Sequence, residues 1–515
     1  MSVPEGRRLI VGIDKGTTVT KAAVFDETGN ELARAARFIE VLSPRRGWHE
    51  EDPAVSLRST MDAVAEAVAA LPGRASDIAA VSVSGHMTGA WLLDETGRPV
   101  RNAIAWPDAR TLDTLTAFEA SPPYEEYLDI SATSALPGMT MLLLGHLARH
   151  EPDVIARTRY FACAKDYVQS FLTGRVVTDP TDVSLMPGDI ATGRISPRLM
   201  ELVGAEAFLS RAPEVRPSGE IIGTVTREAS LATGIPEGTP VANGLGDAIS
   251  AMLGTGVVMP GQAVSVLGTS WLNQMVNRYL DDDLRGVGWV YPSPDGEHWI
   301  RCLAHTAGAG TFDWAVRTFC RDLAGGAASD FAAVEAEALA SEEAGHGLTF
   351  LPYLSPAGVQ APFKDGNVRG VMLGLEHGTT RGDILRAVYE GQVYAAMDCY
   401  RRQGDDLSLL RLTGGGARSR VWRQTFSNAL QVPVELVTTS ESAALGVAIL
   451  ASVNVGIWKD LETAVSEMVR TVGRVEPDPR LAEPHREAFD RFLRAQAAAR
   501  ELFAGFGRAG DQGKD

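Results

Sequence analysis

Leu9-Ile10-Val11-Gly12-Ile13-Asp14-Lys15-Gly16-Thr17-Thr18 is the stretch of sequence that decides the fold. Its first half, Leu9–Ile13, is apolar and β-branched, and a second run of this kind, Ala22–Phe25, follows the Gly-Thr-Thr turn. The pattern predicts a β-hairpin whose tip presents backbone N–H and hydroxyl groups. Such a tip can bind phosphate oxygens, and Asp14 can reach a Mg²⁺ ion that bridges them. Taken alone, the pentapeptide Asp14–Thr18 is better explained as an ordinary β-turn.

The same device occurs again in the second half of the chain. Ala263–Leu267 is predicted to be a strand, Gly268-Thr269-Ser270 a turn, and Leu272–Val276 the returning strand. Two such hairpins in one chain predict an internal duplication. Paired hairpins of this kind are typical of duplicated actin-like domains, which clamp a nucleotide in the cleft between them.

The segments around the hairpins predict the α/β class. Glu31–Ala35 extends the first hairpin to a meander, residues 52–71 have helical periodicity, and Ile78–Val83 is a buried strand. We expect three parts: an N-terminal domain at 1–258, a C-terminal domain at 259–456, and a helical extension with a tail at 457–515.

Composition excludes some partners. The 515 residues include 48 Lys plus Arg and 65 Asp plus Glu, for a net charge of −17, which argues against nucleic acid or an anionic membrane as a partner. The four cysteines lack metal-binding or disulfide spacing, and no apolar run approaches the roughly 20 residues of a membrane span. With no signal-like segment at the N-terminus, we expect a cytoplasmic protein. A homodimer is left open.

A glycine loop in the second half is a further candidate for ligand binding. Gly414-Gly415-Gly416-Ala417 lies between a predicted strand, Leu409–Thr413, and a helix that begins at Ser419. Glycines let a ligand approach the backbone, and the N-terminus of a helix favours negative charge. An ordinary strand-to-helix turn explains the loop equally well. Trp422 and Phe426 on the helix are assigned to the core rather than to adenine stacking.

Asp247 is the candidate general base. It ends the segment Asn243-Gly244-Leu245-Gly246-Asp247, which follows the apolar strand end Pro240–Ala242. Ligands of open α/β folds bind at the carboxyl edge of the sheet, and transfer of phosphate to an alcohol needs a carboxylate that accepts the hydroxyl proton. The alternative is an N-cap of the following helix.

One longer pattern indicates a family. Gly370–Leu375, followed after seven residues by Asp383–Glu390, fits at every position the C-terminal signature of the FGGY family of carbohydrate kinases, and the resemblance extends from residue 9 to about 455. The signature is mostly structural, a strand and a helix. The resemblance implies duplicated actin-like (ribonuclease H-like) ATPase domains, a small sugar substrate, ATP and Mg²⁺.

The resemblance also implies roles for residues at matching positions. Asp14 matches the magnesium-associated Asp, and Asp247 matches the catalytic base, which also lies near the metal and the substrate. Met87, Thr88 and Asp108 fall where the family contacts its sugar. The implied nucleotide-binding residues are Gly16, Thr17, Thr18, Gly268, Thr269, Gly308, Gly310, Gly415, Gly416 and Ala417.

The sugar-binding stretches depart from the family patterns. Xylulokinases have Gln-Met-His-Gly where this chain has His86-Met87-Thr88-Gly89, and Trp-Asn-Asp where it has Trp106-Pro107-Asp108. Glycerol kinases have an Arg-Glu pair at the Met87-Thr88 position, whereas Ser270–Gln274 resembles the branch with L-xylulose and erythritol kinases. The resemblance implies a kinase of a small neutral sugar, with a ketopentose such as xylulose as the first expectation and a polyol (erythritol, ribitol or glycerol) as the alternative.

Two hypotheses from other classes compete with a kinase. A non-catalytic, actin-like, nucleotide-gated binding protein would use the same hairpins but would not need Asp247. A pseudo-kinase that only senses a sugar would lack residues needed for chemistry, and none of those residues is missing. Consumption of ATP that depends on a sugar distinguishes the kinase from both.

Overall fold

The computed structural model describes residues 8–280, 284–305, 308–323, 331–403, 405–437 and 441–505. Residues 506–515, the end of the predicted helical extension with its tail, lie outside these ranges. The chain forms two compact units. Unit 1 contains residues 1–258, 290–300 and 439–469, and unit 2 contains residues 259–289, 301–438 and 470–515.

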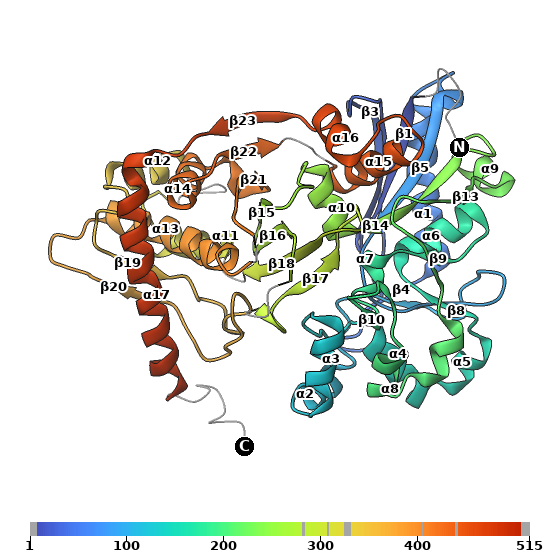
Figure 1. Cartoon of the computed structure of the whole chain (residues 1–515), viewed down its shortest axis with the longest axis horizontal. Coiled ribbons are helices and arrows are strands. Elements are labelled where there is room, and N and C mark those ends of the chain that lie inside the picture. The colour runs from blue at the N-terminus through green and yellow to red at the C-terminus, as the bar shows by residue number, and fades with distance from the viewer. Residues whose placement is uncertain are drawn as a thin grey trace. The chain divides into compact units, whose positions relative to one another are not determined.

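A six-stranded mixed sheet is the centre of unit 1 (Figure 1). β1 pairs antiparallel with β2, β2 antiparallel with β3, β5 parallel with both β1 and β14, and β13 antiparallel with β14. In sheet order the strands are β13 (Ile221–Thr224), β14 (Pro240–Gly246), β5 (Ile78–Gly85), β1 (Leu9–Lys15), β2 (Val19–Phe25) and β3 (Glu31–Phe38).

Both faces of β1 are buried, which explains why its sequence is an apolar run. Val11 and Ile13 belong to the core that this sheet forms with α1 (Pro53–Ala69). On the other face Gly12 meets α15 (Ser442–Asn454), where a Cβ atom on Gly12 would lie 2.0 Å from the Ala444 carbonyl oxygen. Glycine is therefore required for the approach of α15 to the strand.

Glycines also bring α15 against α10 (Asp247–Gly254), the helix that follows β14. A Cβ atom on Gly254 would lie 1.8 Å from the Ser442 carbonyl oxygen, and one on Gly446 would lie 1.9 Å from that of Ser250. Although α15 follows strand β22 of unit 2 (Val434–Val437) in the sequence, it packs on β1, β5 and β14 of unit 1.

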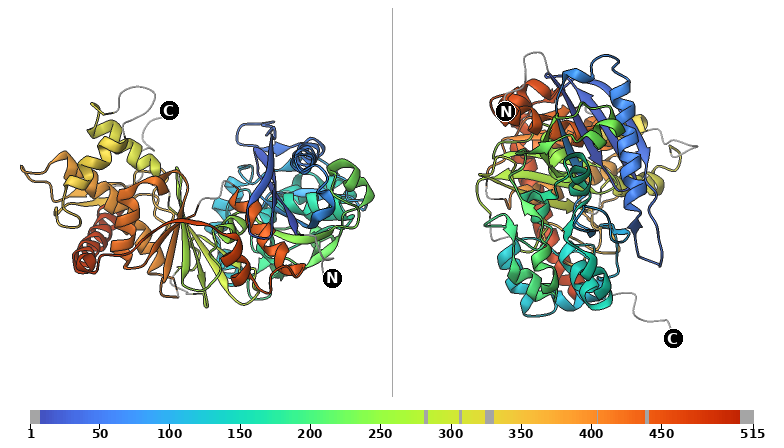
Figure 2. Two further views of the ribbon diagram at one scale, coloured as in Figure 1. Left: turned by 90° about the horizontal axis from the view of Figure 1, so that it is seen from above. Right: turned by 90° about the vertical axis from the view of Figure 1, so that its right-hand side faces the viewer.

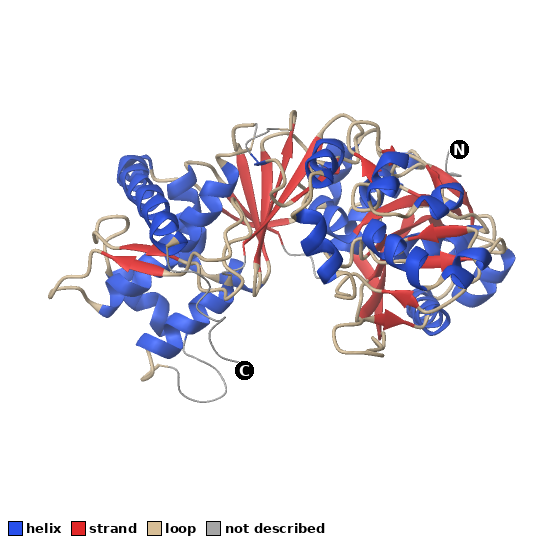
Figure 3. Ribbon diagram, turned by 90° about the horizontal axis from the view of Figure 1, so that it is seen from below, coloured by secondary structure: helices blue, strands red, loops and turns tan. Residues whose placement is uncertain are grey.

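The sheet of unit 2 repeats the plan of unit 1 in its strand order. Figure 3 draws the strands of the protein in red. The strand order β23-β22-β21-β15-β16-β18 corresponds to β13-β14-β5-β1-β2-β3, and the directions of β15–β16, β15–β21, β21–β22 and β22–β23 match those of their counterparts. The predicted duplicated α/β fold is confirmed. The strands are β18 (Trp299–His305), β16 (Trp271–Asn277), β15 (Gln262–Leu267), β21 (Leu409–Thr413), β22 (Val434–Val437) and β23 (Thr471–Val475). Strand β17 (Trp289–Pro292) precedes β18, and most of it belongs to residues 290–300 of unit 1.

Aromatic side chains contribute much of the core of unit 2. Figure 2 shows helices of this unit beside its strands. Trp422 and Phe426 of α14 are buried against Trp271, with ring centroids 5.3 and 5.6 Å from that of Trp271. Both residues are core residues, as predicted. Phe489 and Phe492 attach the last helix to the same core. The helices of this unit are α11 (Ala309–Phe319), α12 (Phe331–Ala340), α13 (Arg381–Tyr400), α14 (Arg420–Leu430) and α17 (Ala482–Ala504), with a hairpin of β19 (Thr349–Leu351) and β20 (Val371–Leu373).

Within the described ranges, no helix is both long enough and apolar enough to cross a membrane.

Smaller elements complete unit 1. The remaining helices are α2 (Leu112–Glu119), α3 (Pro123–Ser131), α4 (Thr140–His150), α5 (Pro152–Arg157), α6 (Ala164–Thr173), α7 (Pro180–Val183), α8 (Pro197–Leu202), α9 (Arg227–Thr233) and α16 (Leu461–Met468). The short strands are β4 (Glu50–Glu51), β6 (Trp91–Leu93), β7 (Ala103–Ile104), β8 (Tyr160–Ala162), β9 (Val177–Thr178), β10 (Gly188–Asp189), β11 (Arg194–Ile195) and β12 (Glu214–Val215).

Candidate functional site

Asp247 lies where β14 ends and α10 begins. It is the first residue of α10, directly after the strand end at Gly246, and its Oδ1 accepts a hydrogen bond of 2.7 Å from the backbone N–H of Ala248. Two effects raise the pKa of Asp247 to about 7: burial, which is the larger, and the negative charge of Asp14. A carboxyl group with this pKa can take up and release a proton near neutral pH.

Asp14 is the next-to-last residue of β1, paired with Ser84 of β5 on one side and Lys21 of β2 on the other. Burial raises the pKa of Asp14 to about 6, although the charge of Lys21 opposes this rise. Two half-buried carboxyl groups, close enough for the charge of one to raise the pKa of the other, are thus brought together from β1 and the start of α10. A divalent cation fits such a pair, because it would relieve the repulsion between them.

The turn between β1 and β2 has the form that the sequence predicts. The hairpin closes at the Lys15–Thr20 pair and leaves residues 16–18 at its tip. A Cβ atom on Gly16 would lie 2.5 Å from the Val19 carbonyl oxygen, so the turn needs glycine there. Thr17 Oγ1 accepts a 2.9 Å hydrogen bond from Nε1 of Trp106, whose side chain is 47% exposed.

Met87 and Thr88 follow the end of β5, next to the end of β14. Met87 packs on Gly246, where a Cβ atom would lie 2.4 Å from the Met87 sulfur. Thr88 has φ of 63°, in the left-handed region that β-branched residues rarely adopt, and such strain is often found at functional sites. The Thr88 hydroxyl is buried and has no hydrogen-bond partner among the described residues.

A buried ion-pair chain connects the tip of the hairpin to this loop. The Lys15 ammonium lies 2.9 Å from Glu51 Oε2 and donates to the Gly16 carbonyl oxygen at 3.0 Å. His86 Nε2 lies 3.1 Å from Glu51 Oε1, and within the described ranges His86 Nδ1 has no partner. Sequence reasoning missed this chain, because Glu51 lies in the acidic run Glu50-Glu51-Asp52, which resembles a solvated surface.

Asp108 is buried and its carboxylate binds protein groups. Oδ1 accepts from the backbone N–H and Nε of Arg110, both at 2.8 Å, and Oδ2 accepts from the backbone N–H of His49 at 2.7 Å. These bonds fix the loop that begins at Trp106.

In unit 2, the predicted nucleotide-binding residues gather around the β15–β16 turn. The backbone N–H of Ala309 donates to the Gly268 carbonyl oxygen at 2.9 Å, which attaches the start of α11 to the turn. A Cβ atom on Gly308 would lie 2.6 Å from the carbonyl oxygen of Thr269, and one on Gly310 would lie 4.0 Å from the same atom. Gly308, Gly310 and the turn therefore form one cluster.

The glycine loop after β21 joins this cluster from the neighbouring parallel strand. Gly414 has φ of 85°, and Gly416 packs on Leu267, where a Cβ atom on Gly416 would lie 2.9 Å from that of Leu267. Within the described residues, no atom lies within 4 Å of a Cβ atom built on Gly415, so a ligand has room to approach the backbone there. Gly415 to Arg418 form one 3₁₀ turn, with Ala417 buried.

Comparison with known proteins gives the family. The N-terminal domain of the FGGY family of carbohydrate kinases matches residues 9–254, and its C-terminal domain matches residues 255–455. The chain is 28% identical over 508 residues to an erythritol kinase of Brucella abortus (95% of this chain, 96% of the relative), and 30% identical over 494 residues to a xylulose kinase of Escherichia coli (94% and 98%).

A solved structure agrees with these relatives. The crystal structure of a xylulose kinase from Rhodospirillum rubrum superposes with a TM-score of 0.86, at 27% sequence identity, over 96% of this chain and 100% of that chain. The two domains have the duplicated actin-like ATPase fold that the hairpins predict. This chain belongs to the FGGY family of carbohydrate kinases and is a phosphotransferase.

Proposed function

We propose that this kinase transfers the γ-phosphoryl group of ATP to a hydroxyl of a small neutral sugar, with a ketopentose such as xylulose as the first candidate and Asp247 as general base. The observation that carries the proposal is the environment of Asp247. Its half-buried carboxyl group lies at the carboxyl end of β14, close enough to Asp14 for the charge of Asp14 to raise its pKa, and a perturbed carboxyl group at this edge of the sheet is a candidate base.

In the proposed reaction Asp247 accepts the proton of the attacking hydroxyl. The hydroxyl oxygen forms a bond to the γ-phosphorus, the bond from that phosphorus to the β–γ bridging oxygen breaks, and ADP leaves with the electron pair. The hydrogen bond from Ala248 N–H holds one carboxylate oxygen of Asp247. The other oxygen is left to receive the proton.

A Mg²⁺ ion fits the carboxyl pair described above. Asp14 and Asp247 would hold it together with phosphate oxygens, which suits a cation that prefers oxygen ligands and retains several waters. When bound, it would supply positive charge to neutralise the transferring phosphoryl group. The pKa values of both carboxyl groups are raised, as expected for two neighbouring carboxyl groups that have no bound cation between them.

The nucleotide itself is proposed to bind through backbone groups of glycine turns. Gly16, Thr17 and Thr18 of unit 1 would bind phosphate oxygens. In unit 2, Gly268 and Thr269 would bind phosphate, while Gly308, Gly310 and Gly415 to Ala417 would line the nucleotide. The open space at Gly415 and the shared cluster around the β15–β16 turn support this assignment.

Two buried polar atoms support a hydroxylated, uncharged acceptor. Thr88 Oγ1 and His86 Nδ1 have no partner in the described part of the chain, and buried polar groups of this kind are usually satisfied by a ligand or water. Met87 would contact the acceptor beside Asp247. The carboxylate of Asp108 binds Arg110 and His49, so Asp108 would act by shaping the loop at Trp106.

A four- or five-carbon polyol is the second candidate. The similarity to an erythritol kinase supports it, because that relative is matched over 96% of its length. Thr88, short and neutral where xylulokinases carry His, leaves the acceptor loop without a charged contact at that position, as an uncharged polyol would allow.

A panel of acceptors tests the proposal. Purified protein is incubated with MgATP and, separately, D- and L-xylulose, ribulose, erythritol, ribitol, glycerol and gluconate, and the sugar phosphates are detected by ³¹P NMR. We expect one neutral ketose or polyol to be preferred by kcat/KM, with poor activity on glycerol and gluconate. A preference for gluconate would contradict the neutral acceptor, and ATP hydrolysis unaffected by every acceptor would contradict the kinase itself.

The cysteines support a reducing compartment, and we propose the cytoplasm. All four, Cys163, Cys302, Cys320 and Cys399, are buried, and none of them forms a disulfide bond. Free buried thiols are usual in proteins kept in a reducing compartment.

A further inference from the structure

We propose that a buried lysine with three aspartates, which no step of the proposed reaction uses, positions the catalytic base: Lys165 and Asp179 hold Thr181, and Thr181 holds the end of β14 that carries Asp247. The inference rests on the proposed function of Asp247. Lys165, Asp166, Asp179 and Asp182 are called the Lys165 cluster below.

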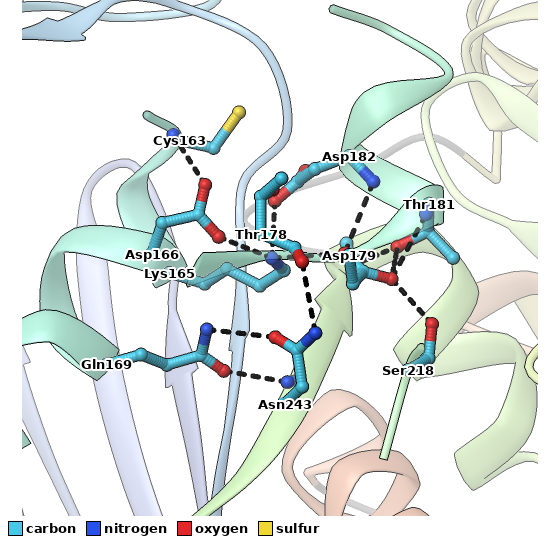
Figure 4. Close-up of polar contacts among 12 residues, drawn as sticks. Cys163, Lys165, Asp166, Gln169, Thr178, Asp179, Thr181, Asp182, Ser218 and Asn243 are labelled. Carbon is cyan, nitrogen blue, oxygen red and sulfur yellow. Dashed lines mark hydrogen bonds and ion pairs between the residues drawn. The ribbon is translucent and has the colours of Figure 1, made fainter. Parts of the chain in front are cut away.

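The Lys165 cluster is closed to solvent. The Lys165 ammonium lies 2.6 Å from Asp166 Oδ1, 3.0 Å from Asp179 Oδ1 and 2.9 Å from Asp182 Oδ2, and all four side chains are fully buried (Figure 4). Of the three carboxylates, Asp166 accepts a hydrogen bond from the ammonium group through Oδ1, and the contacts with Asp179 and Asp182 are ion pairs. Although burial alone would lower the pKa of Lys165, the three carboxylates hold it well above its usual value.

The cation position of the Lys165 cluster is already filled. Ligand atoms of Cys163, Asp166 and Asp182 lie within 4.8 Å of one another, a spacing that could hold a metal ion. The Lys165 ammonium, however, contacts both aspartates of that set. It supplies a positive charge where a metal ion would otherwise bind. We therefore treat the cluster as a structural ion-pair network.

From this cluster, one hydrogen-bond chain leads to the strand end before Asp247. Asp179 Oδ2 accepts from the hydroxyl of Thr181 at 2.7 Å and from its backbone N–H at 3.0 Å. Because the hydroxyl proton of Thr181 points to Asp179, a lone pair of Oγ1 is free to accept the backbone N–H of Gly246 at 3.0 Å. Gly246 directly precedes Asp247.

The strand needs such support, because its regular pairing is interrupted just before Asp247. Between Ala242 and Leu245, β14 has one more residue than β5 has between Ser82 and Ser84, which is a β-bulge. Bulges redirect the residues that follow them and are frequent next to active sites. The side chain of Gln169 accepts the N–H of Gly244 at 2.7 Å, as the Thr181 hydroxyl accepts that of Gly246. At both positions a side chain, and not the backbone of a neighbouring strand, accepts the N–H of β14.

The loop after β5 packs against the same part of α6. A Cβ atom on Gly85 would lie 2.9 Å from the backbone nitrogen of Lys165. Gly85 directly precedes His86, Met87 and Thr88, so the helix that carries Lys165 supports the proposed acceptor loop as well as the strand end.

The test uses the two hydroxyls that contact the same carboxylate oxygen. Asp179 Oδ2 accepts from Ser218 Oγ at 2.7 Å, as it does from Thr181 Oγ1. Of these two hydroxyls, Thr181 Oγ1 also accepts the N–H of Gly246, next to Asp247, whereas the Ser218 segment meets β14 farther from Asp247, where the N–H of Gly219 donates to the Asn243 carbonyl oxygen at 2.7 Å. The variants are Thr181→Val, Thr181→Ser and Ser218→Ala in the full chain. Each is compared with the unmodified protein for kcat, KM for ATP and thermal denaturation, with the acceptor that the unmodified protein uses fastest.

We expect Thr181→Val to lower kcat roughly tenfold or more, because small displacements of a catalytic group have effects of that size or larger. KM for ATP stays within about twofold, because Thr181 is not among the residues proposed to bind the nucleotide. Thr181→Ser, which keeps the hydroxyl, restores kcat, and Ser218→Ala leaves it unchanged. Lys165→Met lowers kcat as well, and adding Thr181→Val to it gives little further loss, because both act through one chain of contacts.

A purely structural role gives a different pattern. Equal losses of thermal stability in Thr181→Val and Ser218→Ala with kcat intact, or no recovery in Thr181→Ser, would overturn the inference. If Lys165→Met does not fold, the Thr181 and Ser218 variants still decide. Full activity of Asp247→Asn would instead overturn the proposed function, so the two failures are distinguishable.

Discussion

The ammonium group of Lys15 lies 2.9 Å from Oε2 of Glu51, and both side chains are buried. Burial alone would raise the pKa of Glu51, but hydrogen bonding and charge from His86, together with the charge of Lys15, lower it to about 2. The pair connects the hairpin tip, through Gly16, to the loop that begins at His86.

The first prediction follows from that pair. Lys15→Met should destabilise the protein by about 3–5 kcal/mol, because removal of one partner leaves a buried charge uncompensated. The measurement is the free energy of unfolding in urea. The double variant Lys15→Met/Glu51→Gln should recover part of the loss, since it leaves no unpaired charge. A single variant as stable as the unmodified protein would show that the pair contributes nothing.

The second prediction concerns pH. The pKa of Asp247 rises from 3.8 to about 7 on folding, so the folded state binds the proton more tightly than the unfolded state between these values. The contribution of Asp247 to stability is fully present below pH 3.8 and is lost as pH rises through about 7.

Without divalent metal, Asp247→Asn should therefore gain stability relative to the unmodified protein between pH 5 and 8, on the order of 1 to 4 kcal/mol. Urea denaturation of both proteins at the two pH values measures the difference. A difference that does not change with pH would mean that Asp247 titrates normally.

The third prediction concerns the metal. Asp14→Asn should raise the Mg²⁺ concentration for half-maximal activity at least about tenfold. Loss of a residue that only hydrogen-bonds to a metal ligand already lowers metal affinity by about that factor. A titration of activity with Mg²⁺ at saturating ATP measures it. The control is Asp94→Asn, in a surface turn where Asp94 accepts from Thr96 and Arg98. Equal Mg²⁺ requirements in the two variants would remove Asp14 from the metal site.

The fourth prediction concerns unit 2. Gly308→Ala should raise KM for ATP about tenfold or more. The new Cβ atom would displace the Gly268-Thr269 turn, and small displacements of a ligand-positioning group have effects of that size. Gly378→Ala is the matched control, since within the described chain a Cβ atom there meets nothing within 4 Å. An unchanged KM in Gly308→Ala would separate this turn from the nucleotide.

Local patterns were sufficient to predict the hairpins and most of the sheet. The strand at Leu9–Ile13 and its partner at Ala22–Phe25 are both found, each within a longer strand, because apolar runs with a glycine turn between them need no distant partner to be recognised. Strand β22 begins at Val434, because Pro433 before it has no N–H to donate to the ladder.

Burial of charge could not be predicted in this way. Lys165 and Asp166 look like solvent-exposed residues in sequence, and only the fold brings Asp179 and Asp182 to them. Lys15 is a similar case, because its partner Glu51 lies 36 residues away on another strand. The tertiary partners decide whether a charged residue can be buried, and these partners leave no local pattern.

Formation of ADP by the unmodified protein and by Asp247→Asn, each with and without the preferred acceptor, tests the central claim most directly. The account predicts that the unmodified protein forms ADP rapidly only when the acceptor is present. It also predicts that Asp247→Asn lowers kcat by roughly 100-fold or more, the cost of losing a general base, with KM for ATP nearly unchanged. Near-normal turnover of Asp247→Asn, or ADP formation that ignores the acceptor, would contradict the account.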